Sequence, residues 1–217
     1  MSPLAFVMFL LTAKNYIHTL PDLIPLTNLS LDMEPYILRL IQIDRKRDTS
    51  NGDPAITHIY TFFAKSSKYN SLFKYIVRAE KYDDCFAIKY YCSRCKHSEY
   101  KYSRVLDLFS AVETKQIMKT CASVIPEILK QYPNASFAFN GSRTYDQANY
   151  VEGPHKTQRY RIYTELVRRL FGEKVFHITH FDDSSSCLFI NRKVNPDIEA
   201  AIIRIYDMFA DIYQIII

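Results

Sequence analysis

A cluster of cationic side chains surrounds a predicted helix start in the second half of the chain. Lys156, Arg159 and Arg161 lie in or just before the first turn of that helix, and Arg143 follows the preceding predicted strand. Cations oppose the helix dipole at this end by roughly 0.3–1 kcal/mol each, whereas the free backbone N–H groups of a first turn favour an anion. Arg143 could reach the same anion as a bidentate fork. We therefore predict an anion-binding site at these four residues.

Two carboxylates near this cluster offer a different explanation for it. Asp146 and Glu152 lie between the predicted strand and the predicted helix. If they pair with the arginines, the cations serve the fold and no ligand is needed. The sequence leaves both explanations open.

His180 and Asp182 form a candidate pair for acid–base chemistry. They are two residues apart on a predicted strand, so their side chains share a face. A neighbouring carboxylate orients an imidazole ring and raises its basicity. The sequence places no nucleophile beside them, and an edge histidine in a hairpin is the alternative. The loop "DDSSS" that starts at Asp182 is predicted to be a solvated hairpin turn, with a metal or phosphate loop as the alternative.

A zinc site is a further candidate, formed by Cys92, Cys95 and His97. The Cys-x-x-Cys spacing is the usual half of a structural zinc site, which needs four converging ligands. His97 follows Cys95 by only two residues, which strains a common centre, and other candidate ligands lie far along the chain. Ordinary reduced cysteines near a turn are the preferred interpretation, and we expect no metal and no cofactor.

Composition limits the classes of protein to which this chain can belong. The 217 residues are 48% hydrophobic and 24% charged, as in a soluble globular domain. The net charge of +5 and the pI of about 8.8 permit a polyanionic partner without requiring one. Five cysteines, an odd number at irregular spacings, favour a reducing cytoplasm over a secreted disulfide framework. The motifs of nucleotide hydrolases, dinucleotide-binding enzymes, kinases and zinc proteases do not occur, which makes a non-enzyme the better prediction.

Positive charge is concentrated in residues 65–104, which hold ten Lys or Arg against four Asp or Glu. Tyr and Phe alternate with these cations. Such a sheet could stack nucleic-acid bases on its aromatic rings while Lys74, Arg78, Lys89 and Lys101 contact phosphates. A plain solvated face is the preferred interpretation, because the aromatic and basic signature of the common RNA-binding sheet does not occur.

Residues 1–32 differ in character from the rest of the chain. They include an uncharged apolar run from Pro3 to Ala13, which is too short to span a bilayer. No basic residue precedes that run, so a signal peptide is not favoured. We interpret residues 1–32 as a leader or a misassigned extension, with Met33 as a second candidate for the natural start.

The remaining residues, 33–217, predict a single compact α+β domain. Its first half has the Tyr-, Phe-, Ile- and Val-rich runs of an antiparallel meander, with strands expected at 37–43, 58–64, 72–79, 85–91 and 98–102. The hydrophobic period then changes, and the second half predicts the order α-β-α-β-β-α. Its helices are expected at 110–131, 157–171 and 196–216, and its strands at 135–139, 175–181 and 187–193.

Particular residues define the ends of the predicted helices. Ser110 and Glu113 fit a capping box at the start of the first helix, and Pro126 should kink that helix. Gly172 should end the second helix. In the third helix a heptad seam comprises Ile198, Ile202, Ile205, Phe209, Ile212 and Ile216. We expect this seam to cover a sheet, with a homodimer contact through residues 196–216 as the alternative.

Three segments resemble a family of uncharacterised bacterial proteins. The segments are "YPNASFAFNGSR", "TQRYRIY" and "CLFINRK", and the resemblance extends over about residues 133–193. That family has a strand ending in Gly, a Thr-Lys-Arg-aromatic-Arg-x-Tyr helix start and a closing strand of Leu-Ile-Asn-Arg type. In this chain Gln158 replaces the usual Lys and Tyr160 the usual Phe. The resemblance implies a bacterial cytoplasmic protein with a compact α+β fold, and no established activity.

The function expected from these features is that of a non-enzymatic binding module for an anionic partner, either nucleic acid or a nucleotide phosphate. One alternative is an enzyme that acts on a phosphate-containing substrate through His180 and Asp182. Another is a structural protein that dimerises through its last helix. No association with a membrane is expected.

Overall fold

The computed structural model describes residues 33–47, 49, 52–104, 108–146, 149–150 and 152–212. Residues 1–32, predicted to be a leader or an extension, lie outside this part of the chain.

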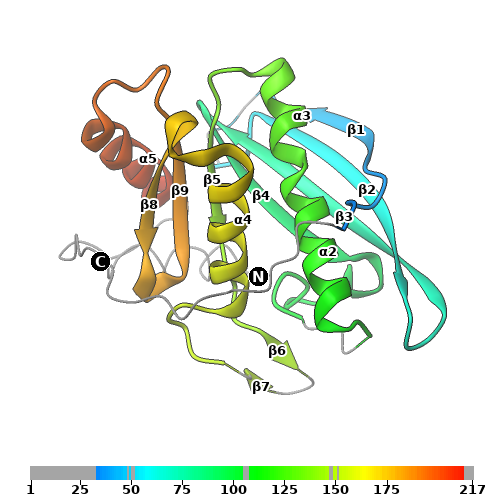
Figure 1. The fold of residues 1–217 in the computed structure, drawn as a ribbon. Helices are drawn as coiled ribbons and strands as arrows, with labels where there is room; N and C mark the ends of the chain where they lie inside the picture. Colours follow the sequence, from blue (N-terminus) through cyan, green and yellow to red (C-terminus); the bar gives the residue numbers. More distant parts are fainter. Residues whose placement is uncertain are drawn as a thin grey trace.

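Seven strands form one mixed sheet in the order β1-β2-β3-β4-β5-β9-β8 (Figure 1). Neighbouring strands are antiparallel except for β4 and β5, which are parallel. The predicted meander corresponds to β1–β4, so the α+β class and its N-terminal meander are confirmed. The strands are β1 (Arg39–Arg45), β2 (Ile56–Ser66), β3 (Ser71–Tyr82), β4 (Cys85–Cys92), β5 (Ser136–Asn140), β8 (Phe176–Phe181) and β9 (Ser186–Asn191).

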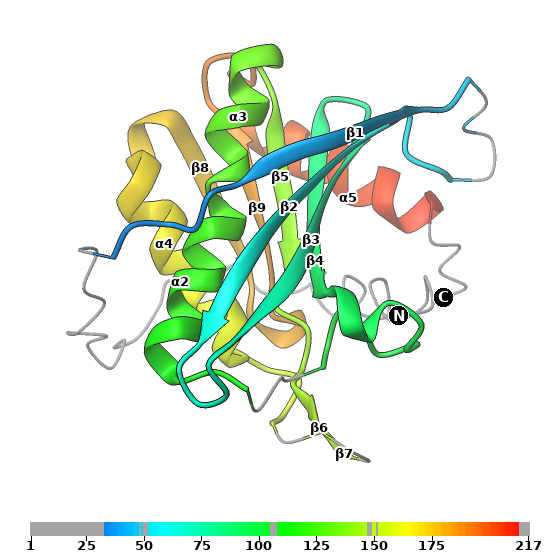
Figure 2. The same ribbon diagram turned by 90° about the vertical axis from the view of Figure 1, so that its right-hand side faces the viewer.

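Helices lie on both sides of this sheet (Figure 2). One face carries α2, α3 and α4, and the other carries α5. The helices are α2 (Ala111–Ala122), α3 (Val124–Gln131), α4 (Gln158–Val175) and α5 (Ile198–Ile212), with short 3-10 turns η2 (Ser93–Cys95) and η3 (Asp182–Ser184). No helix of the described residues is long and apolar enough to cross a membrane.

The main core lies between the sheet and the three helices α2, α3 and α4. Alternate residues of β3 point into it, because side chains of a strand alternate between faces. Phe73, Tyr75, Val77 and Ala79 are all buried there. The capping box predicted for α2 is present, since the Ser110 side chain accepts from the N3 backbone and the N3 carboxylate accepts from the Ser110 backbone.

The second core lies between α5 and the opposite face of the sheet. Ala201, Ile205 and Phe209 are buried there against residues of β4, β5 and β9, which include Leu188 and Ala138. The described part of the heptad seam in the last helix therefore packs against the sheet of the same chain, as the preferred interpretation expects. Its final residue, Ile216, lies outside the described residues.

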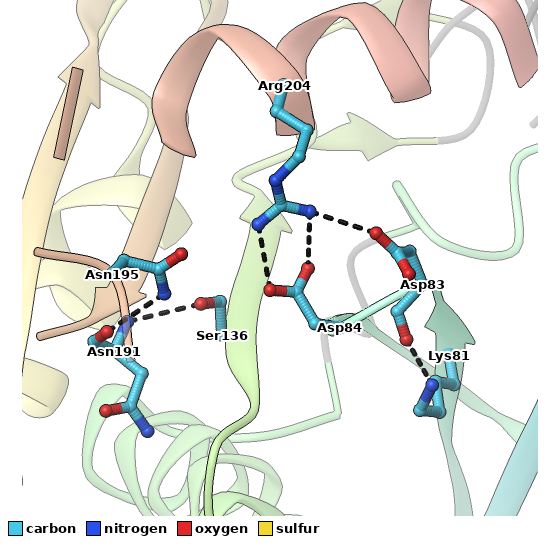
Figure 3. A network of polar contacts seen from close by, with 7 residues as sticks. All are labelled: Lys81, Asp83, Asp84, Ser136, Asn191, Asn195 and Arg204. Atoms are coloured by element: carbon cyan, nitrogen blue, oxygen red, sulfur yellow. Dashed lines mark hydrogen bonds and ion pairs between the residues drawn. The ribbon is translucent and has the colours of Figure 1, made fainter. Parts of the chain in front are cut away.

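A polar network fixes α5 against the turn between β3 and β4 (Figure 3). The Arg204 guanidinium donates to both carboxylate oxygens of Asp84, each at 2.8 Å, and to Asp83 at 3.0 Å. Asp83 has a positive φ of 51°, which a short polar residue tolerates in a tight turn. Beside it, the Asn191 backbone donates to the Ser136 hydroxyl and joins β9 to β5.

Two details of the predicted elements are wrong. The predicted helix 110–131 is broken at Ser123, where α2 ends and α3 begins, and it does not kink at Pro126. Because Pro126 lies in the first turn of α3, its missing N–H leaves no intrahelical bond unmade. The predicted strand 98–102 forms successive turns, with Lys101 N–H bonded to the Ser98 carbonyl at 3.2 Å.

Candidate anion-binding site

The start of α4 is tied to two segments that are distant in sequence. Thr157 caps the helix, because its hydroxyl accepts from the Tyr160 backbone at 3.3 Å. The same hydroxyl donates to the Gly141 carbonyl at the exit of β5. The Thr157 backbone donates to the Ser185 hydroxyl at 3.0 Å, and that hydroxyl donates to the Pro154 carbonyl at 2.6 Å. The strand exit, the helix start and the β8–β9 turn therefore form one rigid corner.

The loop "DDSSS" belongs to this corner, and the prediction that it is a solvated turn is wrong for its serines. Ser184, Ser185 and Ser186 are all buried, with exposed fractions of 2%, 0% and 5%. Ser185 has a positive φ of 47°. Its hydroxyl faces the start of α4, where it forms the hydrogen bonds with Thr157 and Pro154 described above. Of the three, Ser185 holds the helix start in place, through its bond from the Thr157 backbone.

Glu152 occupies the position that the sequence analysis assigned to an external anion. Its carboxylate accepts from the Gln158 backbone at 2.9 Å and from the Thr144 backbone at 2.9 Å. A carboxylate at a helix N-terminus is stabilised by the same donors and dipole that would attract a phosphate. Glu152 thus pairs with backbone groups, which leaves the arginine side chains to other partners. The side chain of Asp146 lies outside the described residues.

The structure divides the four predicted anion-binding residues into two groups. The Arg143 side chain donates to the Glu152 carbonyl at 3.1 Å and lies 3.9 Å above the Tyr150 ring. Lys156 pairs with Asp182 at 3.0 Å. Arg159 and Arg161, in contrast, line a cavity.

This cavity, of about 420 Å³, lies between the C-terminal end of β4, helix α2, the start of α4 and the turns that follow η2. Its lining includes the large aromatic and aliphatic side chains of Tyr75, Tyr90, Tyr91, Tyr102, Phe109, Ile117, Met118 and Ile162. Five cations also line it, namely Lys101, Arg104, Lys115, Arg159 and Arg161, and its described lining contains no carboxylate. The cavity therefore combines an aromatic wall with an excess of positive charge among its described lining residues.

Among the described residues, no carboxylate is paired with a cavity arginine. Arg159 donates to the backbone carbonyls of Tyr102 and, at 3.2 Å, of Arg104. These bonds satisfy its N–H groups but leave its charge. Within the described part of the chain, no carboxylate lies within 4.0 Å of the Arg104, Arg159 or Arg161 guanidinium. An anion entering the cavity would meet charge that the fold does not use.

Lys101 shows the same excess of positive charge. Burial lowers the pKa of its ammonium, and the charge of Arg78 lowers it further. The ammonium lies over the rings of Tyr91 and Tyr102, 5.2 and 5.1 Å from their centroids. Burial also raises the pKa of Tyr102 to about 12, so that its ring stays neutral at physiological pH.

His180 and Asp182 do not form a direct pair, because the Tyr160 hydroxyl lies between them. That hydroxyl donates to Asp182 Oδ1 at 2.7 Å and lies 2.8 Å from His180 Nδ1. Burial lowers the pKa of His180, while the charge of Asp182 opposes this effect. Neither residue lines the cavity. The sequence analysis missed Tyr160, since a hydroxyl that bridges a helix and a hairpin leaves no local pattern.

The three candidate zinc ligands are not brought together. Cys92 and Cys95 are buried beside the cavity, whereas His97 is exposed. All five cysteines are free. Within the residues that the structure describes, no group of three or more His, Cys, Asp or Glu side chains is arranged to hold a metal.

The predicted basic sheet face is partly neutralised. Arg78 and Lys89 both bind the buried Glu80, at 2.9 and 2.6 Å, so two of its four cations have an internal partner. Lys101 instead lines the cavity together with Arg104, which the charge excess of residues 65–104 could have indicated. Lys115 carried no signal in the sequence, because α2 is placed beside these residues only by the fold.

In comparisons with known protein families, curated proteins and solved structures, this chain matches none. The resemblance to uncharacterised bacterial proteins therefore stays a prediction. The function of the site must be inferred from its geometry.

Proposed function

We propose that this protein is a non-enzymatic binding module whose cavity holds a nucleotide-type anion, an aromatic base that carries phosphate. The observation that carries this proposal is a cavity of about 420 Å³ lined by aromatic rings, five cations and no carboxylate among its described residues. Ligand sites of this size are mostly apolar, with a few charged groups that fix orientation. Both parts of a nucleotide have a complementary surface here.

Each part of the ligand is assigned to one part of the cavity wall. The base packs among the aromatic side chains, including Tyr90, Tyr91 and Phe109. The phosphate binds the guanidinium groups of Arg104 and Arg161, which form charge-assisted and bidentate hydrogen bonds with such oxygens. Arg159 contributes charge while it holds the backbone of residues 102 and 104. Of the residues predicted from the sequence to bind an anion, Arg159 and Arg161 remain in the proposed site. Lys156 is left out of it, because it pairs with Asp182.

Binding is proposed in preference to catalysis for one reason. The acid–base candidates His180 and Asp182 are joined through Tyr160 and do not line the cavity. A substrate held in the cavity would therefore not meet them.

Replacing Arg161 tests this proposal without disturbing the core, because Arg161 is exposed. Titration calorimetry with the four ribonucleoside monophosphates should show binding that weakens as salt rises, and no comparable binding of the nucleosides. Arg161→Ala should weaken phosphate-dependent binding about tenfold, since a hydrogen bond to a charged group contributes about 1.5 kcal/mol or more.

Arg168→Ala is the matched control, because it removes an exposed arginine of the same helix that pairs with Glu165 at 2.7 Å. It should leave nucleotide binding unchanged. Equal affinities of nucleotides and nucleosides, or equal losses in the two variants, would contradict the proposal.

A further inference from the structure

A row of neighbouring aromatic side chains lies beside the cavity, on a small hairpin and the turn next to it. The hairpin consists of β6 (Tyr145–Asp146) and β7 (Asn149–Tyr150), which lie apart from the main sheet near the start of α4 (Figure 1). The rings of Tyr100 and Tyr145 are stacked at 4.1 Å with an interplanar angle of 13°. Tyr145 and Tyr150 then meet edge to face, with ring centroids 5.2 Å apart and an interplanar angle of 77°, and the Arg143 guanidinium lies over the Tyr150 ring at 3.9 Å. We call these four residues the aromatic row.

The aromatic row and the cavity are joined through the same backbone. Arg104, a cavity residue, forms a parallel bridge with Tyr145, and the Tyr145 backbone donates to the Ser103 carbonyl at 2.8 Å. Thr144, which precedes Tyr145, also lines the cavity. Arg159 binds the other side of this segment. A ligand that leaves the cavity on this side therefore meets the aromatic row directly.

The aromatic row is not buried as a core would be. Tyr150 keeps 42% of its surface exposed, and both Tyr100 and Tyr145 are only half-buried. Rings that form a small hydrophobic core are shielded from water, whereas rings that form a binding surface stay accessible to it. Rings and arginine planes of this kind are the usual stacking surfaces for unpaired bases.

The charges around the aromatic row also suit a polyanion. Arg104 and Lys101 lie at its cavity end, and Arg143 lies at its far end. The nearby Glu152 carboxylate keeps its charge, but its two backbone N–H donors hold it at the start of α4. Glu99 is hydrogen-bonded to Tyr100.

We infer that the ligand is single-stranded nucleic acid, with one base in the cavity and the following nucleotides stacked along the aromatic row. This inference rests on the proposed function of the cavity and extends it to a longer ligand. Duplex nucleic acid would not fit, because its bases are not available for stacking on side chains.

The test compares a mononucleotide with oligonucleotides of increasing length. Oligothymidylates and oligouridylates of 1, 2, 4, 8 and 12 nucleotides are titrated against the full chain by competition with a fluorescent 12-mer. Affinity should rise with length over at least the first four nucleotides, about the smallest site size of single-strand-binding folds. A 12-base-pair duplex should bind more weakly than either single strand. Preference for the ribose or the deoxyribose series would support the inference equally.

Tyr150→Ala should weaken binding of the 8-mer about tenfold, the loss typical of one stacked base, and leave mononucleotide binding unchanged. Tyr69→Ala is the matched control, because Tyr69 is an exposed tyrosine, 52% accessible, in the turn between β2 and β3. It should affect neither ligand.

The outcomes separate the two proposals. If mononucleotides bind but longer oligonucleotides bind no more tightly, the single-strand inference is overturned and the cavity proposal stands. The same holds if Tyr150→Ala does not change binding of the 8-mer. If the duplex binds as tightly as the single strand, the inference is also overturned. If no mononucleotide binds, the cavity proposal itself fails.

Discussion

Gly141→Ala should destabilise the protein by about 3 kcal/mol, the upper part of the usual range for an overpacked site. A Cβ at this position would lie 2.6 Å from Tyr160 Cβ and 2.7 Å from the Thr157 hydroxyl, and it would also meet the Tyr160 backbone nitrogen. All three atoms belong to the first turn of α4. Because backbone atoms cannot move aside as a flexible side chain can, the helix start itself must shift.

This shift should also weaken ligand binding, because α4 carries two of the cavity arginines. The Thr157 hydroxyl would lose its bond to the Gly141 carbonyl, and Arg159 and Arg161 would move with the helix. Urea denaturation measures the loss of stability, and calorimetry with a ribonucleoside monophosphate measures the loss of binding.

Gly153→Ala provides the control for this experiment. Apart from its two chain neighbours, no heavy atom of the described residues lies within 4 Å of a Cβ built at Gly153, which is exposed in the loop before α4. Its free energy of unfolding should stay within about 0.5 kcal/mol of the wild-type value. Similar effects of the two substitutions would show that the close packing of β5 against α4 is not what makes Gly141 necessary.

His58→Leu should stabilise the protein by about 1 kcal/mol at pH 7, since an unpaired polar group in a core costs about 1–3 kcal/mol. His58 is fully buried on β2, and neither ring nitrogen has a hydrogen-bond partner among the described residues. Its surroundings are the rings of Tyr60, Phe86 and Tyr132. Leucine has a similar volume and no polar atom.

The stabilisation by His58→Leu should grow as the pH falls. Burial lowers the pKa of His58 in the folded state, and the charge of Arg45 lowers it further. Lys81, over the Tyr132 ring at 6.0 Å, is a second cation on this side. In the unfolded chain the pKa is about 6.5, so the unfolded state takes up the proton first. Wild-type stability is therefore lost from about pH 6.5 down to the lower folded pKa, and the variant lacks this loss.

Urea denaturation of both proteins between pH 8 and pH 5 measures this difference. Burial also lowers the folded pKa of His177 and of His180, but these residues are present in both proteins and cancel in the comparison. A difference between the two proteins that stays constant with pH, or a less stable variant at pH 7, would show that His58 has an unrecognised partner in the folded state.

The fold could be predicted from the sequence where local patterns determine it. The alternation of β3, the capping box at Ser110 and the interruption at Gly172, whose φ is 67°, all depend on residues close in sequence, although α4 resumes after Gly172 and runs to Val175. The break at Ser123 could not be predicted, because the hydrophobic pattern continues through it. Residues 98–102 include aromatic residues typical of a strand, but the segment forms turns. Local hydrogen bonds and the bond from Arg159 to the Tyr102 carbonyl stabilise this turn conformation.

The cavity was less predictable than the fold for a physical reason. Arg159 binds the backbone of Tyr102 across 57 positions of the chain, and Lys115 reaches the same cavity from another helix. The hydrophobic periodicity of the sequence does not predict contacts between such distant residues. The sequence did place Arg159 and Arg161 correctly as residues at a helix start, where cations oppose the dipole. It could not show that Glu152 would take the helix donors and leave the arginines to the cavity.

A crystal structure with a ribonucleoside monophosphate at saturating concentration would locate the bound nucleotide. We expect the base to lie within the cavity, against the aromatic wall that includes Tyr90 and Tyr91. We also expect phosphate oxygens about 2.8 Å from guanidinium nitrogens of Arg104 or Arg161. A nucleotide bound elsewhere on the chain, or an empty cavity at a concentration where calorimetry shows saturation, would contradict the proposed function.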